Sequence, residues 1–338
     1  MTSPRPHGRD VLAALLESPK ARGAFLLTSV LNPLWSLRIE DRAPLCLMTM
    51  VRGDAWVLPD RGEPVLLRPG DVAVVRGPAP YTVADDPGTP VRTVVGPGQR
   101  CTTVPGTGAA EPAVRGVRAW GDDLRETSSV MLSGTYQEPG EVGRRLLDAM
   151  PGMLVRPARE GDDALVGLLA AEMSKDEPGQ EPVLDRLLDL LLVSVLRTWL
   201  AAPGTGAPAC YRAQGDPVVG PALRLLHDDP AHPWTVASLA ARVGASRAGL
   251  ARRFTALVGE PPMAYLANWR LALAADLLRD TDATVAAVAR QVGYSTPFAL
   301  SAAFKRVRGV SPREYRTKGP VTCARPLDAQ PRTVVLAP

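Results

Sequence analysis

One helical pattern occurs twice between residues 235 and 316, and it constrains the fold more than any other feature of the chain. Val243-Gly244 in the first copy matches Val292-Gly293 in the second, and Phe254 matches Phe304. A short amphipathic helix, a turn glycine and a second helix with apolar residues at i, i+4 and i+7 are typical of a helix-turn-helix unit. The repeat predicts two such units on one body, and duplex DNA is a repetitive target that two units could read.

The positive charge of the chain is concentrated in residues 216–316. This segment has 13 Lys and Arg against 8 Asp and Glu, whereas the whole chain carries a net charge of +4. The remainder is therefore slightly acidic. Binding to phosphates requires this distribution of charge.

Local signals place the helices of each copy. Thr235, Ser246 and Thr284 have side chains that cap helix starts, and Gly244 permits the tight turn between two helices. In the second helix of the first copy, Leu250, Phe254 and Leu257 are predicted to face the core. The opposite face is then the one that would enter a major groove.

The groove faces provide the candidate DNA contacts. Arg252 can bind guanine with two hydrogen bonds, whereas its counterpart in the second copy is Ala302. We therefore expect the second copy to position the protein on phosphates, with Phe298 making an apolar contact or packing inward. The alternative is that the arginines only solubilise a helix. The candidate base-reading residues are Arg247, Ala248, Ala251, Arg252, Thr255, Thr296, Pro297, Phe298 and Ser301; the candidate phosphate contacts are Ser246, Arg253, Lys305, Arg306, Arg313 and Arg316.

The upstream half has a β texture. Short apolar runs between residues 35 and 95 are separated by turn signals such as Gly53-Asp54 and Arg68–Asp71. This spacing predicts a small antiparallel barrel or sandwich. Two helices are expected next, and the second, residues 181–200, is apolar over more than half of its girth. We expect it to pair with its copy in a homodimer through Leu184, Leu188, Leu191, Leu192 and Val195; the alternative is packing on the barrel.

The motifs Gly293-Tyr294-Ser295, Phe304-Lys305 and the run from Gly309 to Arg316 resemble the C-terminal signature of the AraC/XylS family of bacterial transcription regulators. The run RPGDVAVV resembles the turn and strand of cupin barrels, as found in the sensor domain of one subgroup. The resemblance implies base contacts at Ala248, Ala251 and Arg252. It also implies a regulator, by family habit an activator, that binds double-stranded promoter DNA and RNA polymerase.

The expected architecture is mixed and multi-domain: a metal-free cupin-like antiparallel β-barrel, a helical dimerisation segment and an all-α domain with two helix-turn-helix units. The expected boundaries are 1–155 for the cupin-like sensor, 156–201 for the dimerisation segment, 202–215 for a linker, 216–316 for the DNA-binding domain and 317–338 for a disordered tail.

Two control mechanisms are open. An apolar small molecule could occupy the barrel among Met48, Met50, Trp56 and Tyr81, since barrel mouths are common pockets. Alternatively, a cysteine could sense oxidants or electrophiles. Cys101 follows Arg100 in a loop expected to be flexible, whereas Cys46 lies in an apolar strand where a buried filler is the competing interpretation.

Several function classes are disfavoured. No histidine occurs between His7 and His227, which argues against a histidine-bound metal in the barrel, and the four cysteines form no CxxC pair. No enzyme motif and no cofactor site stand out. No apolar run is long enough to span a membrane and no signal peptide is evident, so we expect a cytoplasmic protein. A helical module that binds only proteins remains the alternative to DNA binding.

Overall fold

The computed structural model describes residues 25–107, 113–114, 118–136, 147, 149–158, 163–175, 177–202, 209–318 and 333–336. The chain divides into two compact units. The sheet unit contains residues 19–139, 150–206 and 328–338, and the helical unit contains residues 1–18, 140–149 and 207–327.

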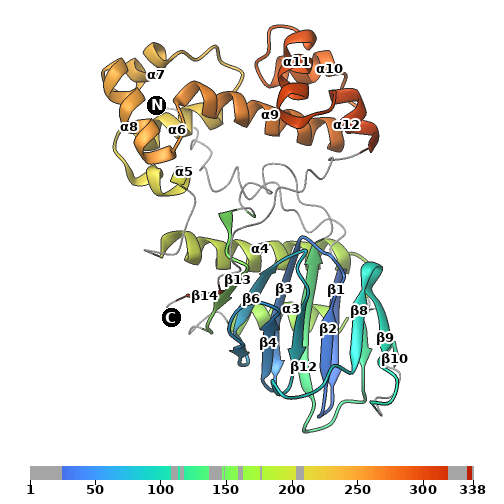
Figure 1. The fold of residues 1–338 in the computed structure, drawn as a ribbon. Coiled ribbons are helices and arrows are strands. Elements are labelled where there is room, and N and C mark those ends of the chain that lie inside the picture. Colours follow the sequence, from blue (N-terminus) through green and yellow to red (C-terminus); the bar gives the residue numbers. More distant parts are fainter. Residues whose placement is uncertain are drawn as a thin grey trace. The chain divides into compact units, whose positions relative to one another are not determined.

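Two sheets form the sheet unit (Figure 1). The larger sheet has the order β10 (Ala113–Val114), β11 (Ala119–Gly121), β1 (Phe25–Leu31), β12 (Ser129–Tyr136), β3 (Leu45–Arg52), β6 (Val72–Arg76), β13 (Met153–Arg156) and β14 (Thr333–Val335). The smaller sheet has the order β5 (Val65–Leu67), β4 (Ala55–Pro59), β7 (Tyr81–Ala84), β2 (Ser36–Ile39), β8 (Thr93–Gly96) and β9 (Arg100–Thr103). The prediction of antiparallel pairing is wrong for β1–β11 and β2–β8, which are parallel. β13 and β14 also pair in parallel.

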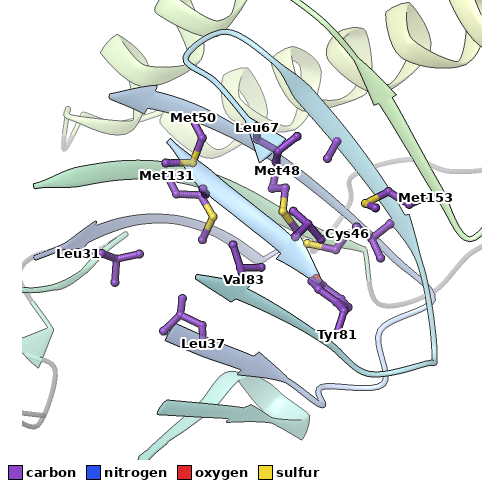
Figure 2. Close-up of a cluster of buried hydrophobic side chains, with 14 of the residues drawn as sticks. Leu31, Leu37, Cys46, Met48, Met50, Leu67, Tyr81, Val83, Met131 and Met153 are labelled. Atoms are coloured by element: carbon purple, nitrogen blue, oxygen red, sulfur yellow. The ribbon is translucent and has the colours of Figure 1, made fainter. Parts of the chain in front are cut away.

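One apolar core lies between the two sheets. Cys46, Met48 and Met50 alternate along β3 and point into it, as do Tyr81 and Val83 from β7 (Figure 2). Alternation along a strand sends every second side chain to the opposite face. The intervening β3 residues are also buried, so the larger sheet is covered on its other face as well.

Helices α3 (Asp163–Met173) and α4 (Gln180–Ala201) provide this cover. Gly134 on β12 lies directly under α4, since a Cβ added there would stand 2.6 Å from Cδ1 of Leu188. Leu184, Leu188, Leu191, Leu192 and Val195 are at most 1% exposed within a single chain. The predicted dimer contact through these five residues is therefore wrong: the apolar face of the helix packs on its own sheet, which was the competing interpretation.

The chain returns to the sheet unit near its C-terminus. Strand β14 pairs in parallel with β13, and the backbone N–H of Leu336 donates to the carbonyl of Val155 at 2.8 Å. Leu336 is 1% exposed. The prediction of a disordered tail is wrong for residues 317–318, which are helical, and for residues 333–336; residues 319–332 and 337–338 lie outside the described part.

The Arg68–Asp71 turn forms as its sequence predicts. Gly70 has a φ of 86°, which an L side chain rarely adopts. One carboxylate oxygen of Asp71 accepts from the backbone N–H of Arg68 at 2.9 Å, and the other accepts from Ala158 at 2.8 Å. The turn is thus fixed to the segment that follows β13.

The helical unit consists of α5 (Ala209–Arg212), α6 (Val219–Asp228), α7 (Val236–Arg242), α8 (Arg247–Val258), α9 (Pro262–Asp280), α10 (Val285–Gln291), α11 (Pro297–Arg308) and α12 (Pro312–Lys318). The long helix α9 contributes to two cores, one with α6–α8 and one with α10–α12 (Figure 1). Residues 209–215, predicted as part of a linker, belong to the first core, where Ala213 is 1% exposed. No helix in the described part of the chain is long and apolar enough to cross a bilayer.

Candidate DNA-binding interface

Two helix pairs, α7–α8 and α10–α11, are built by the same local signals. The hydroxyls of Thr235 and Ser246 accept from backbone N–H groups three residues later, at 3.0 and 3.1 Å. Thr284 and Thr296 do the same in the second pair, at 3.2 and 3.1 Å. Each hydroxyl satisfies one of the backbone donors that a helix start leaves unpaired. The caps predicted at Thr235, Ser246 and Thr284 are confirmed.

A glycine turns the chain within each pair. Gly244 and Gly293 have φ values of 69° and 83°, in the left-handed region that favours glycine. At Gly293 an added Cβ would also stand 2.7 Å from the Cα of Ala231, so space as well as conformation excludes a side chain. The crossing of α10 and α11 thus depends on this residue.

The second helix of each pair buries one stripe and exposes the other. Leu250 and Phe254 of α8, and Leu300 and Phe304 of α11, are fully buried. The predicted inward residue Leu257 is instead 39% exposed. Of the nine candidate base-reading residues, Arg247, Ala248, Arg252, Thr255, Thr296 and Phe298 are exposed, and Ala251, Pro297 and Ser301 are half-buried. Phe298 is 84% exposed, so the inward packing considered for it is wrong.

Some of the predicted DNA contacts already have partners in the protein. Thr255 and Ser301 donate their hydroxyl protons to the carbonyls of Ala251 and Pro297 in their own helices, at 2.8 Å each. Their oxygens keep only the capacity to accept. Ser246 and Thr296 accept through their oxygens as caps, so each keeps a proton that could be donated to a phosphate.

Two of the predicted phosphate contacts are arginines with structural bonds. Nε of Arg253 donates to Oδ2 of Asp216 at 2.8 Å, and Nη2 forms an ion pair with the same oxygen at 2.7 Å. Arg316 donates to the carbonyls of Leu278, at 3.0 Å, and Ala283, and so ties α12 to the end of α9. Lys305, Arg306 and Arg313 are exposed.

Sequence reasoning missed the residues that hold the first pair in place. Oδ1 of Asp216 accepts from the backbone N–H groups of Val218 and Val219 at 2.9 Å each, so it caps α6 while its other oxygen holds Arg253. Burial opposes ionisation, but the bonds from Val219, Val218 and Arg253 together lower the pKa of Asp216. An aspartate just before a helix is a recognisable cap signal; its distant arginine is not.

The sheet unit contains a cavity of about 370 Å³ between its two sheets. Of the four predicted effector contacts, Met48 and Tyr81 line it, whereas Met50 and Trp56 do not. Trp56 lies between Ala55 and Val57, which face the core, so alternation along β4 directs it away. The described lining consists of Leu27, Ser29, Leu37, Ile39, Asp41, Cys46, Met48, Tyr81, Val83, Val95, Gln99, Cys101, Ala119, Trp120, Met131, Ser133 and Thr135.

Both candidate redox thiols line this cavity. Burial raises the pKa of Cys46 to about 11 and raises the pKa of Cys101 above its ordinary value. Cys101 lies in β9 rather than in a flexible loop. Neither thiol has the lowered pKa that a reactive thiolate requires.

Comparisons with known proteins find matches to both parts of the chain. A cupin family model matches residues 10–201, and a helix-turn-helix domain model matches residues 239–318. A putative AraC-like transcription regulator of Streptomyces antibioticus is 32% identical over 91% of this chain and 98% of its own, and one of Streptomyces lividans is 32% identical over the same shares. The solved DNA-binding domain of AdpA in complex with a target DNA is 34% identical, with a TM-score of 0.29, over 30% of this chain and 92% of that chain.

The chain therefore belongs to the family of AraC-like transcription regulators. It carries a cupin-like N-terminal domain and a C-terminal helix-turn-helix domain of the DNA-binding type.

Proposed function

We propose that this regulator reads promoter sequence mainly with α8 and uses α11 mainly to hold the DNA backbone. Both helix pairs act as helix-turn-helix units in this proposal. The observation that carries it is the exposed face of α8, where Arg247, Ala248 and Arg252 lie opposite the buried Leu250 and Phe254. Small alanines allow close approach to base edges, and Arg252 supplies a guanidinium that can bind guanine O6 and N7.

The outer face of α11 supports an unequal division of roles. Ala302 stands where α8 has Arg252, and the proton of the Ser301 hydroxyl is used within the helix. Lys305 and Arg306, both exposed, add positive charge to the last turns of the helix. Such side chains bind phosphates regardless of base sequence.

Substitution of Arg252 tests base reading. Arg252→Ala should cost about 1–3 kcal/mol on the native promoter and relax the preference at one base pair. Arg224→Ala is the matched control, because Arg224 is an exposed arginine on α6, outside the proposed face. Affinities on wild-type and single-substituted operators are measured by fluorescence anisotropy. Equal losses for both variants, with base preference unchanged, would refute the assignment of Arg252.

We further propose that a small, mainly apolar effector occupies the cavity of the sheet unit and controls the regulator. The cavity volume lies within the range of small-molecule sites, about 300–1,000 Å³. Val83→Phe would fill part of this space. A reporter gene under the native promoter should then lose its response to the effector, while the purified variant keeps its affinity for DNA.

Activation through contact with RNA polymerase is part of the same proposal. A relative named as a transcriptional activator, RclR of Escherichia coli, is 29% identical over 45% of this chain and 54% of its own. Transcription in vitro with purified RNA polymerase tests this: the regulator should raise the yield of transcript from its promoter. A lowered yield would identify a repressor instead.

We also propose that the protein is a homodimer, in line with a two-part operator. Because the inner face of α4 is used within one chain, a contact through this helix would use its outer stripe, where Val183 and Leu190 are 44% and 52% exposed. Leu190→Arg should then produce monomers in sedimentation experiments. A monomeric wild-type protein would contradict the proposed dimer.

A further inference from the structure

The cavity of the sheet unit has an uneven distribution of charge. Among the described residues that line it, Asp41 is the one carboxylate, and none is Lys, Arg or His. Most of the other lining side chains are apolar. A carboxylate beside an apolar space is costly to desolvate unless a cation or several donors satisfy it.

The carboxylate of Asp41 has two partners in the protein, and both are neutral. Oδ1 accepts from the backbone N–H of Ala43 at 3.0 Å, and Oδ2 accepts from Nε2 of Gln99 at 2.8 Å. Each oxygen keeps a lone pair for a further donor. These two partners hydrogen-bond to the carboxylate but carry no positive charge to offset its negative charge.

The bond between Asp41 and Gln99 joins two strained turns. Arg42 and Gln99 have φ values of 60° and 58°, and they are the two non-glycine residues with positive φ in the described part of the chain. Conformations of this kind persist where the surroundings hold them, and they concentrate at ligand sites. Here one strained residue, Arg42, follows Asp41 in the chain, and the other, Gln99, donates a hydrogen bond to its carboxylate.

The field of Asp41 extends into the cavity. Burial is the main cause that raises the pKa of Tyr81 and Cys46, and the charge of Asp41 adds to it in both cases. Both groups are therefore neutral at physiological pH. They leave the described lining with a net charge of −1 when Asp41 is ionised.

We propose that the effector of this cavity is an amphiphile with an apolar body and a positively charged head, such as a primary ammonium. The inference rests on the proposed effector site and specifies its ligand class. The body lies against the apolar side chains between the sheets, and the ammonium donates to Asp41. An ammonium that takes the place of the Gln99 amide also frees the turn that carries Gln99. A carboxylate head of the same size would meet Asp41 without a compensating cation.

The experiment uses three probes with one body and different heads: decylamine, decanol and decanoate, each below its self-association concentration. Binding to the full-length protein is measured by calorimetry for the wild type, Asp41→Asn and Asp54→Asn. Asp54 is an exposed carboxylate outside the cavity, so its variant removes the same charge elsewhere. Wild type and Asp54→Asn should bind decylamine about tenfold or more tightly than decanol, with decanoate weakest. Asp41→Asn should bind decylamine and decanol alike.

The order of the three affinities in the wild type tests the proposed ligand class even if Asp41→Asn fails to fold. Decanoate binding as tightly as decylamine would overturn the inference while leaving an effector site in place, and so would an amine preference that survives in Asp41→Asn. If none of the three probes binds the wild type, both the ligand class and the effector site are rejected. The role of α8 in DNA binding is unaffected by that result.

Discussion

Nε of Arg253 donates to one oxygen of Asp216 at 2.8 Å, and Nη2 forms an ion pair with the same oxygen at 2.7 Å. The second oxygen of Asp216 caps α6, so one carboxylate connects the proposed reading helix α8 to the first helix of the unit. Arg253 was predicted to contact a phosphate. Its bonds identify it first as a residue that positions α8, and a phosphate contact through its remaining nitrogen stays a prediction.

Asp216→Ala should destabilise the protein more than Arg253→Ala. Loss of a cap costs about 0.5–2 kcal/mol, whereas an ion pair whose arginine side chain is about half exposed contributes under about 1 kcal/mol. Because the folded pKa of Asp216 is lowered, its contribution is present above the ordinary pKa of aspartate and is lost as the pH falls through the folded pKa. Urea unfolding at pH 7 and at pH 3 measures this. A cost of Asp216→Ala that does not shrink at pH 3 would contradict the expectation.

Lys305→Ala and Arg306→Ala should weaken binding to all DNA sequences alike. Each lost phosphate contact should reduce the slope of log K against log salt by about 0.9. Arg61→Ala is the control, since this exposed arginine lies in a turn of the sheet unit. Titrations between about 50 and 200 mM salt measure the effect. An unchanged slope would remove these residues from the interface.

Phe298→Ala should leave the stability unchanged and reduce the affinity for the native operator. The ring is 84% exposed, so its removal opens no cavity, and the change in unfolding free energy should stay within about 0.5 kcal/mol. Bound DNA would offer the ring an apolar partner such as a thymine methyl group. Val307→Ala, which removes another exposed apolar side chain from α11, should change neither quantity. Equal affinities for the wild type and Phe298→Ala would show that the ring does not contact DNA.

Control by cysteine oxidation is disfavoured, and this can be tested directly. With a pKa of about 11, the Cys46 thiol is almost entirely protonated at pH 7, and burial moves the pKa of Cys101 in the same direction. Alkylation of both should be slow at pH 7 and should accelerate as the pH rises toward 11. Cys46→Ser and Cys101→Ser should keep normal regulation under oxidant. Rapid alkylation of Cys101 at neutral pH would revive the thiol mechanism.

Sequence reasoning succeeded where the signal is local. The caps Thr235 and Ser246 and the turn glycine Gly244 act within a few residues, so the helix pairs could be placed from the sequence. The surface against which an apolar helix face packs could not be predicted in this way. The stripe around Leu188 on α4 has the same pattern whether it packs on its own sheet or on a second chain. The bond between Asp216 and Arg253 joins residues 37 positions apart, and no local pattern indicates it.

For the cavity too, the sequence predicts the features that depend on a local pattern and misses those that depend on contacts between distant segments. Alternation along β3 and β7 predicts which residues face inward, so Met48 and Tyr81 could be named from the sequence. Asp41 and Gln99 follow β2 and β8, which pair in parallel within the smaller sheet, and this pairing of distant segments has no signature in the residues around either position.

The parallel pairing of β14 with β13 makes residues 207–327 of the helical unit an insertion within the sheet unit rather than an appendage to it. A protein shortened after residue 201 would keep its cavity residues. It would lose β14, which covers the outer edge of β13, and it would also lose the buried side chain of Leu336. An uncovered strand edge invites pairing with other chains. The two units therefore cannot be separated by a single cut, and a stable sheet unit on its own requires the last strand to be grafted back.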